Sequence, residues 1–165
     1  MIKVRMGRVA DFARAQAIEV AAGEVFRDVG LGFVADMPPP GVDVLAGFAA
    51  GGRFWVAEEE RTWAYLLAEV VDGCAHIAQV TVHPAQRGRR LGSSLVDHLD
   101  GWAAARGLAA LTLTTYRDVP WNGPYYERIG FRVIEPTPGL AAVVADEARI
   151  GLDPDARVCM RRELS

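Results

Sequence analysis

Three strand-like segments follow one another closely in the middle of the chain, and they restrict its possible folds more than any other feature. They read RFWVAEE, TWAYLLAEV and CAHIAQVTVHP, at residues 53–59, 62–70 and 74–84. Turn signals separate them at Glu60-Arg61 and at Asp72-Gly73, and the second is a dipeptide typical of tight hairpins. Strands joined by such short turns pair antiparallel. The sequence therefore predicts an antiparallel meander.

A helix and a further strand follow the meander. The helix is expected to begin at Gly88 or Ser93 and to end at Arg106-Gly107. Its apolar stripe consists of Leu91, Leu95, Leu99 and Trp102. The next strand, AALTLTTY, occupies residues 109–116. Because a long helix separates this strand from the strand at 74–84, the two are expected to lie parallel through a right-handed crossover.

The rest of the chain supplies further elements around this centre. Strands are expected at 2–6, 131–134 and 156–164, and helices at 9–23, 120–129 and 138–152. Residues 24–52 contain three consecutive prolines, and we expect an irregular, partly helical lid over a substrate, with a short helix closing at Gly51 or Gly52. The length of 165 residues suits one domain. We predict a single α/β domain over residues 1–165, with a mixed, mostly antiparallel sheet of about seven strands flanked by helices.

The composition narrows the classes of partner. A net charge of -3 argues against a nucleic-acid partner, because phosphate binding needs a broad basic surface. No apolar run is long enough for a membrane span, and the start MIKVRMGRVADF lacks the apolar core of a signal peptide, so a cytoplasmic location is expected. Cys74 and Cys159 have no metal-ligand spacing, so both are expected to be small buried hydrophobes and no metal site is predicted.

Arginines and glycines gather where the strand at 74–84 gives way to the helix, in the stretch QRGRRLGSS at residues 86–94. A helix N-terminus has free N–H groups and a positive dipole end, so a phosphate fits there. The stretch matches neither the dinucleotide fingerprint, which follows a first strand, nor the P-loop, which needs Gly-Lys-Ser/Thr. Either it holds the pyrophosphate of another cofactor, or Gly88 and Gly92 only shape a tight turn and the arginines form a solvated face.

Two stretches match motifs that occur together in one family. Residues 87–92, RGRRLG, fit the pattern Arg or Gln, two residues, Gly, one residue, Gly or Ala, except that Arg90 stands where glycine is usual. Residues 122–134, NGPYYERIGFRVI, fit a segment in which Asn precedes a short helix, and VTVHP ahead of the turn is a third match. Over residues 74–134 the chain thus resembles the GCN5-related N-acetyltransferases (GNAT). The backbone N–H of Arg90 is expected to contribute to binding, on the condition that its dihedral angles are right-handed, with its guanidinium outside, near phosphate or solvent.

The resemblance implies an acetyl-CoA site. In that family the parallel fourth and fifth strands splay apart, and the pantetheine of coenzyme A pairs with the fourth strand. By position, Val80 and Val82 would offer the backbone groups for this pairing, and an N–H near them would polarise the thioester carbonyl. The pyrophosphate would be bound by Arg87, Gly88, Arg89, Arg90, Leu91, Gly92 and Ser93. Asn122 is also expected at the cofactor.

Catalytic roles follow from the same resemblance, and each keeps an alternative. Tyr126 matches the family's general acid, which protonates the departing thiolate, or else it is only a packed aromatic residue. His76 falls where some members carry a base, and the alternatives are a structural histidine, Glu69 in the preceding strand, or deprotonation relayed by water. Trp121 and Asn122 either line the acceptor pocket, or Asn122 caps the short helix and Trp121 packs in the core.

The resemblance therefore implies an N-acetyltransferase that moves an acetyl group from acetyl-CoA to a primary amine of a small molecule or peptide, by direct transfer in a ternary complex. A monomer or a homodimer is expected. A cationic amine acceptor is favoured by the acidic residues Asp36, Asp43, Glu58 and Glu59. The alternative from another class is a non-catalytic acyl-CoA-binding regulatory module, which would not need an acid at Tyr126.

Overall fold

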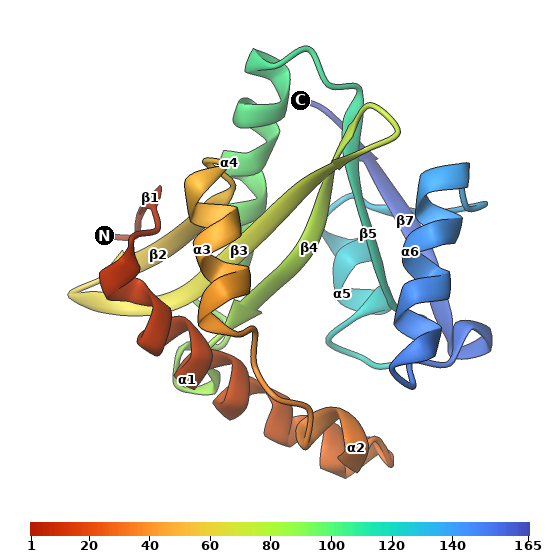
Figure 1. Cartoon of the computed structure of the whole chain (residues 1–165), viewed down its shortest axis with the longest axis horizontal. Helices are drawn as coiled ribbons and strands as arrows, with labels where there is room; N and C mark the ends of the chain where they lie inside the picture. Colours follow the sequence, from red (N-terminus) through yellow and green to blue (C-terminus); the bar gives the residue numbers. More distant parts are fainter. The chain divides into compact units, whose positions relative to one another are not determined.

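Seven strands form one sheet in the order β1-β2-β3-β4-β5-β7-β6 in the computed structural model, which describes residues 1–165 (Figure 1). The strands are β1 (Lys3–Met6), β2 (Phe54–Glu59), β3 (Arg61–Val71), β4 (Cys74–Val82), β5 (Ala110–Tyr116), β6 (Arg132–Ile134) and β7 (Arg157–Glu163). Strands β4 and β5 pair parallel, whereas β2 pairs antiparallel with β1 and β3, and β7 pairs antiparallel with β5 and β6. The predicted mixed, mostly antiparallel sheet with parallel fourth and fifth strands is confirmed.

The helices agree with the expected segments apart from small differences at their ends. They are α1 (Phe12–Gly23), α2 (Gly32–Ala35), α3 (Val42–Ala50), α4 (Leu91–Ala105), α5 (Gly123–Arg128) and α6 (Pro138–Arg149). A 3-10 helix at Glu24–Val29 precedes α2, so the partly helical character expected for residues 24–52 is confirmed. None of these helices has both the length and the apolar character that a membrane crossing requires.

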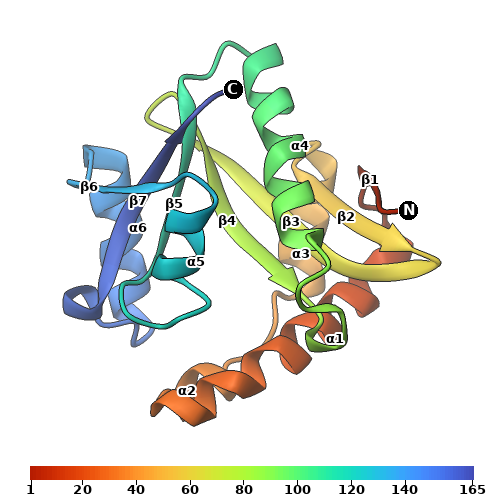
Figure 2. The same ribbon diagram turned by 180° about the vertical axis from the view of Figure 1, so that it is seen from behind.

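The chain divides into two compact units, and β3, β4 and α4 each contribute residues to both. The first unit comprises Met1–Ala68 and Ala78–His98. Within it, α1 and α3 lie on one face of the strands and the start of α4 lies on the other (Figures 1 and 2). Residues three apart on α1 share one face of the helix and pack onto β2 and β3. The resulting core consists of Phe12, Ala15, Ile18, Leu45, Phe54, Val56, Tyr65 and Leu67.

The second unit comprises Glu69–Ile77 and Leu99–Ser165. Within it, α6 lies on one face of β5 and β7 and α5 on the other (Figures 1 and 2). Asp72, in the turn between β3 and β4, accepts hydrogen bonds from the Thr137 hydroxyl and, at 2.7 Å, from the Gly139 N–H. These two donors lower the pKa of the Asp72 carboxyl. Asp72 thereby caps α6 from a distant turn, since the Thr137 side chain at the N-cap makes no capping bond.

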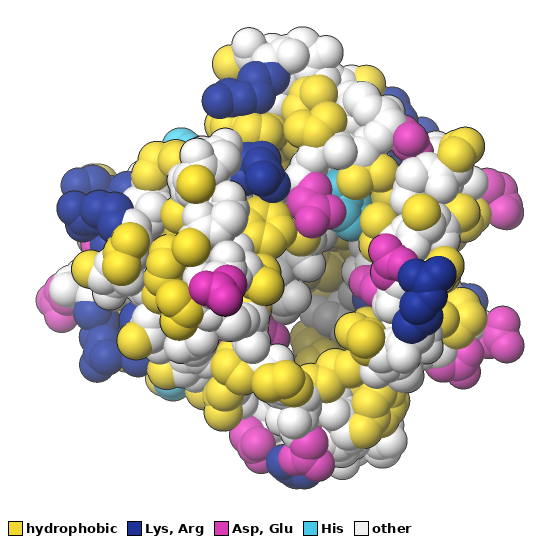
Figure 3. Space-filling model, viewed as in Figure 1, with side chains coloured by type: hydrophobic (Ala, Val, Ile, Leu, Met, Phe, Trp, Pro, Cys, Tyr) yellow, Lys and Arg dark blue, Asp and Glu magenta, His cyan; other side chains and the backbone are white.

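Charged side chains stand in separate groups in the space-filling view (Figure 3). Several Lys and Arg side chains in that view lie next to Asp or Glu. Among the charged residues of these units, Arg27 pairs with Asp36 at 2.6 Å, and Arg149 pairs with Asp146. The charges of these pairs are therefore compensated locally.

Candidate active site

The turn between β4 and α4 adopts the backbone conformation that a helix-terminal anion site requires. Arg87 is extended, with φ -60° and ψ 145°, and Gly88 is left-handed, with φ 76°. A Cβ atom at Gly88 would meet nothing within 4 Å, so the backbone there is open to a ligand. Helix α4 begins at Leu91, and its first N–H groups have no intrahelical acceptor. Left-handed turns of this kind gather N–H groups into a concave anion cradle, and the helix dipole adds to it.

Arg90 departs from its expected conformation. The condition of right-handed dihedral angles is not met, because its φ is 63°. This left-handed conformation explains why glycine is usual at the position, since a side chain there crowds the following carbonyl. The Arg90 carbonyl accepts hydrogen bonds from the Ser94 N–H at 2.9 Å, from the Ser94 hydroxyl at 2.7 Å and from the Ser93 hydroxyl at 3.2 Å. The start of α4 thus holds Arg90 in a strained backbone.

Replacing Arg90 with glycine is expected to stabilise the protein. A left-handed non-glycine residue costs about 1–2 kcal/mol, and the extra freedom of glycine in the unfolded chain removes about half of that gain. We expect the free energy of unfolding to rise by about 0.5–1 kcal/mol in urea denaturation. Arg87→Gly is the matched control, since Arg87 is not left-handed, and it should be neutral or destabilising. Equal effects of the two substitutions would contradict the strain at Arg90.

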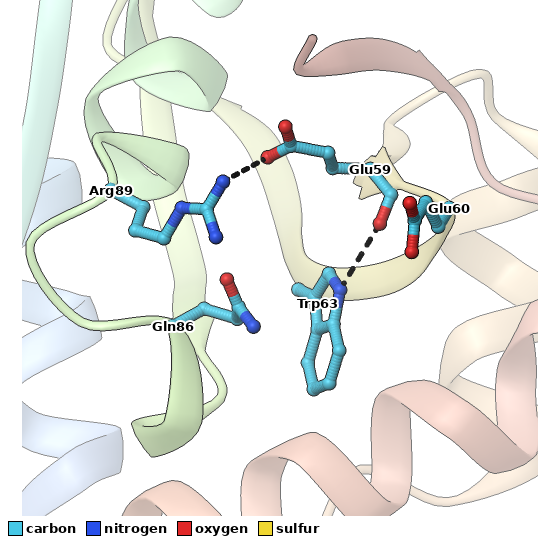
Figure 4. Close-up of a pocket in the computed structure, with 5 residues that line it drawn as sticks. All are labelled: Glu59, Glu60, Trp63, Gln86 and Arg89. Atoms are coloured by element: carbon cyan, nitrogen blue, oxygen red, sulfur yellow. Dashed lines mark hydrogen bonds and ion pairs between the residues drawn. The ribbon is translucent and has the colours of Figure 1, made fainter.

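The three arginines of the turn differ in their surroundings. Arg89 donates to the Glu59 carboxylate at 2.9 Å, and both line a cavity of about 170 Å³ together with Glu60, Trp63 and Gln86 (Figure 4). The Arg89 guanidinium therefore points toward the end of β2. Arg87 and Arg90 are exposed, and their side chains make no hydrogen bond or ion pair. These two guanidinium groups remain available to an anion.

Strand β4 has few partners on its β5 side. The ladder consists of Ala75 with Leu111 and His76 with Thr112, although β4 continues to Val82. Val80 and Val82 are half-buried and have no residue of β5 as a ladder partner. The end of this ladder agrees with the splayed strands that the resemblance implies.

Tyr126 lies on α5 in the second unit. The first position of this helix, Gly123, has no room for a side chain. A Cβ atom at Gly123 would lie 2.5 Å from the Arg117 carbonyl oxygen. Asn122 occupies the N-cap position, but its side chain donates to the Trp121 carbonyl at 3.2 Å and makes no capping bond, so the alternative of a side-chain cap is not found. The half-buried ring of Tyr126 packs edge-on against Tyr125 and Phe131, with centroids 5.3 and 5.8 Å away.

The two base candidates, His76 and Glu69, lie in the second unit in different environments. His76 is 2% exposed, and its Nδ1 is 2.9 Å from the Thr112 hydroxyl oxygen. Burial lowers the pKa of His76 to about 4, so the imidazole is neutral at pH 7. These features favour the structural interpretation of His76. Glu69 is half-buried, and its side chain makes no hydrogen bond or ion pair.

The pKa of His76 predicts a pH-dependent stability. The unfolded residue titrates near 6.5 and the folded one at about 4, so between these values the unfolded chain binds more protons. Stability is therefore lost as pH falls through this window, by about 3 kcal/mol for a shift of this size. Glutamine does not titrate. Between pH 7 and 4, the free energy of unfolding of His76→Gln, measured by urea denaturation, should therefore fall by about 3 kcal/mol less than that of the wild type. Parallel pH profiles of the two proteins would contradict the buried neutral imidazole.

A polar cluster in the first unit was not predicted. The Glu19 carboxylate on α1 accepts hydrogen bonds from side chains of β3 and β4, namely Tyr65, Gln79 and Thr81. These partners are 46, 60 and 62 residues away in sequence, so no local pattern connects them. The available signal was the alternation of β4, which places Gln79 and Thr81 on one face. No group of three or more His, Cys, Asp or Glu side chains is placed to hold a metal ion.

Comparison with known proteins defines the class. The model of the acetyltransferase (GNAT) domain matches residues 50–133, about half of the chain. The chain therefore belongs to the GNAT family, and it is an acetyl-CoA-dependent N-acetyltransferase.

Solved structures agree on the fold. The chain is similar to the ribosomal-protein-S18-alanine N-acetyltransferase of Escherichia coli, with TM-score 0.68 and 20% identity over 100% of this chain and 95% of that one. It is similar to the PaiA N-acetyltransferase of Thermoplasma acidophilum in complex with coenzyme A, with TM-score 0.72 and 13% identity over 99% of each chain. A GNAT acetyltransferase of Brucella melitensis in complex with acetyl-CoA gives TM-score 0.58 and 21% identity over 84% and 90% of the two chains.

Proposed function

We propose that this N-acetyltransferase transfers the acetyl group of acetyl-CoA directly to a primary amine of a small molecule or peptide, in a ternary complex. The observation that carries the cofactor site is the turn between β4 and α4. Its left-handed residues Gly88 and Arg90 precede a helix start with free N–H groups. The turn and the family motif occupy the same residues.

The residues present fit the cofactor. Acetyl-CoA supplies the activated acetyl group as a thioester. The backbone N–H groups of residues 87–93 and the exposed guanidinium groups of Arg87 and Arg90 would bind its pyrophosphate. The unpartnered segment of β4 at Val80 and Val82 would bind its pantetheine through backbone groups, and an N–H there would polarise the thioester carbonyl. Asn122 is proposed as a further cofactor-binding residue, because it stands at the asparagine position of the family motif.

We assign the proton transfers by motif and environment. Tyr126 is proposed to donate the proton that the departing thiolate takes up, since a thiol ordinarily titrates near 8.5. The incoming amine must lose a proton. We propose that a water relay or Glu69, whose side chain has no polar partner, removes this proton. Both are preferred to His76, because His76 is buried.

The acceptor is proposed to be a cationic amine, but the acids that suggested this from sequence are mostly neutralised. Asp36 pairs with Arg27 at 2.6 Å and Glu59 pairs with Arg89 at 2.9 Å. Glu58 pairs with Arg5 at 3.1 Å. Of these four residues only Asp43 is without an ion pair. Support for a cationic acceptor must therefore come from another carboxylate.

A panel of amines tests the proposal. Polyamines, amino acids, aminoglycosides and peptides would be incubated with acetyl-CoA, and free thiol would be measured together with the mass of each acceptor. We expect stimulation of thiol release by cationic primary amines and a matching acetylated product. Activity restricted to acidic or neutral acceptors would refute the cationic assignment. Slow hydrolysis without stimulation by any amine would favour the acyl-CoA-binding module.

A further inference from the structure

Three uncharged side chains of the first unit donate hydrogen bonds to the Glu19 carboxylate. Its Oε1 accepts hydrogen bonds from the Tyr65 hydroxyl at 2.5 Å, the Thr81 hydroxyl at 2.7 Å and Gln79 Nε2 at 3.1 Å. Gln79 Nε2 also donates to the Thr81 hydroxyl at 2.9 Å, which fixes the two side chains together. Oε2 has only a 3.3 Å contact with Gln79 Nε2. A carboxylate offers lone pairs on both oxygens, so Oε2 keeps capacity for a further donor.

Tyr65 strengthens this arrangement because it is a permanent donor. The side chain is fully buried, with 0% exposure. Burial, followed by the negative charge of Glu19, raises the pKa of the Tyr65 hydroxyl far above its ordinary value. The phenol therefore stays protonated and keeps donating to Glu19 across the working pH range.

Glu19 also lacks the cation that other carboxylates of similar burial possess. Five buried or half-buried carboxylates form ion pairs with arginine, namely Asp11, Glu58, Glu59, Asp100 and Glu147. Glu19 is half-buried and forms none, and all its donors are neutral. Glu69 has no cation either, but no donor orients it. Removing a charge from water without a counter-charge is unfavourable, so an oriented, unpaired carboxylate is suited to a cationic ligand.

The cluster lies on the strand segment that the proposed function gives to the cofactor. Gln79 and Thr81 alternate with Val80 and Val82 along β4. Side chains of a strand point alternately to its two faces, so the backbone that would pair with pantetheine also carries the donors to Glu19. The carboxylate is thereby fixed beside the segment where the thioester would lie.

We propose that Glu19 binds the second, protonated amine of a diamine-type acceptor, whose other amine receives the acetyl group. The inference rests on the proposed function and adds the class of acceptor to it. Oε2 of Glu19 accepts from the non-reacting ammonium, and Tyr65, Thr81 and Gln79 hold the carboxylate in place. Glu19 is a specificity-determining residue in this scheme, and the proton of the reacting amine goes elsewhere.

The test compares a diamine with a monoamine of equal chain length, 1,4-diaminobutane and 1-aminobutane. Glu19→Gln keeps the size and the acceptor oxygen but removes the charge. We expect the KM for the diamine to rise about tenfold or more, whereas the KM for the monoamine and the Kd for acetyl-CoA stay unchanged. Glu163→Gln is the matched control, because Glu163 is exposed and already paired with Arg161. It should change none of these values.

A second measurement keeps the proposal falsifiable if Glu19→Gln folds poorly. The diamine KM of the wild type should rise with salt concentration more steeply than its monoamine KM. Equal salt dependence, equal effects of Glu19→Gln on both amines, or no effect on either would overturn the role of Glu19. A wild type that acetylates only other amines would also overturn it while leaving the proposed function intact. A wild type that acetylates no amine would overturn both.

Discussion

Gly88→Val is expected to weaken the binding of acetyl-CoA by about 10- to 100-fold, measured by titration calorimetry. Gly88 has a φ of 76°, which a β-branched residue adopts only with strain. Valine would therefore move the turn and misdirect the N–H groups that bind the pyrophosphate. No atom lies within 4 Å of the position of the added Cβ, so the effect would come from the backbone and not from a clash.

Gly30→Val is the matched control. Gly30 has the same φ of 76° and open space around a Cβ, and it belongs to the same compact unit. Both substitutions should lower the melting temperature by similar amounts, but only Gly88→Val should change the affinity for acetyl-CoA. An unchanged affinity in Gly88→Val would remove the cofactor from this turn.

Tyr126→Phe is expected to lower kcat by about 10- to 100-fold while the KM for acetyl-CoA stays close to that of the wild type. The substitution removes the hydroxyl and keeps the ring that packs on Tyr125 and Phe131. Loss of a general acid should also remove the alkaline limb of the pH profile of kcat, whereas loss of packing alone would not.

Tyr125→Phe is the control, because it removes a hydroxyl one residue away on the same helix. It should leave kcat nearly unchanged. A fall of less than a few-fold in Tyr126→Phe would leave this residue only a packing role. A large effect of Tyr125→Phe instead would place the acid one residue earlier.

The order of strands and helices could be predicted because its signals are local. Alternation in β1 and β7, the Asp72-Gly73 turn and the glycine after α4 each depend on residues close together in the chain. The parallel pairing of β4 and β5 followed from the length of the connecting helix. These features hold whatever the distant residues are.

The less predictable features depend on tertiary contacts. The left-handed Arg90 violates a local preference, because the start of α4 fixes its backbone. The burial of His76 and the environment of Glu19 arise from strands and helices that meet only in the folded chain. The acids near residues 36–59 suggested a cationic acceptor, but arginines elsewhere in sequence neutralise most of them.

The most direct measurement follows an isotopically labelled acetyl group from acetyl-CoA in a single turnover with wild-type protein and 1,4-diaminobutane, by mass spectrometry. We expect the label on one nitrogen of the diamine, with one free coenzyme A for each acetylated molecule. Label found only in acetate, or retained in acetyl-CoA across the whole amine panel, would contradict acetyl transfer to an amine.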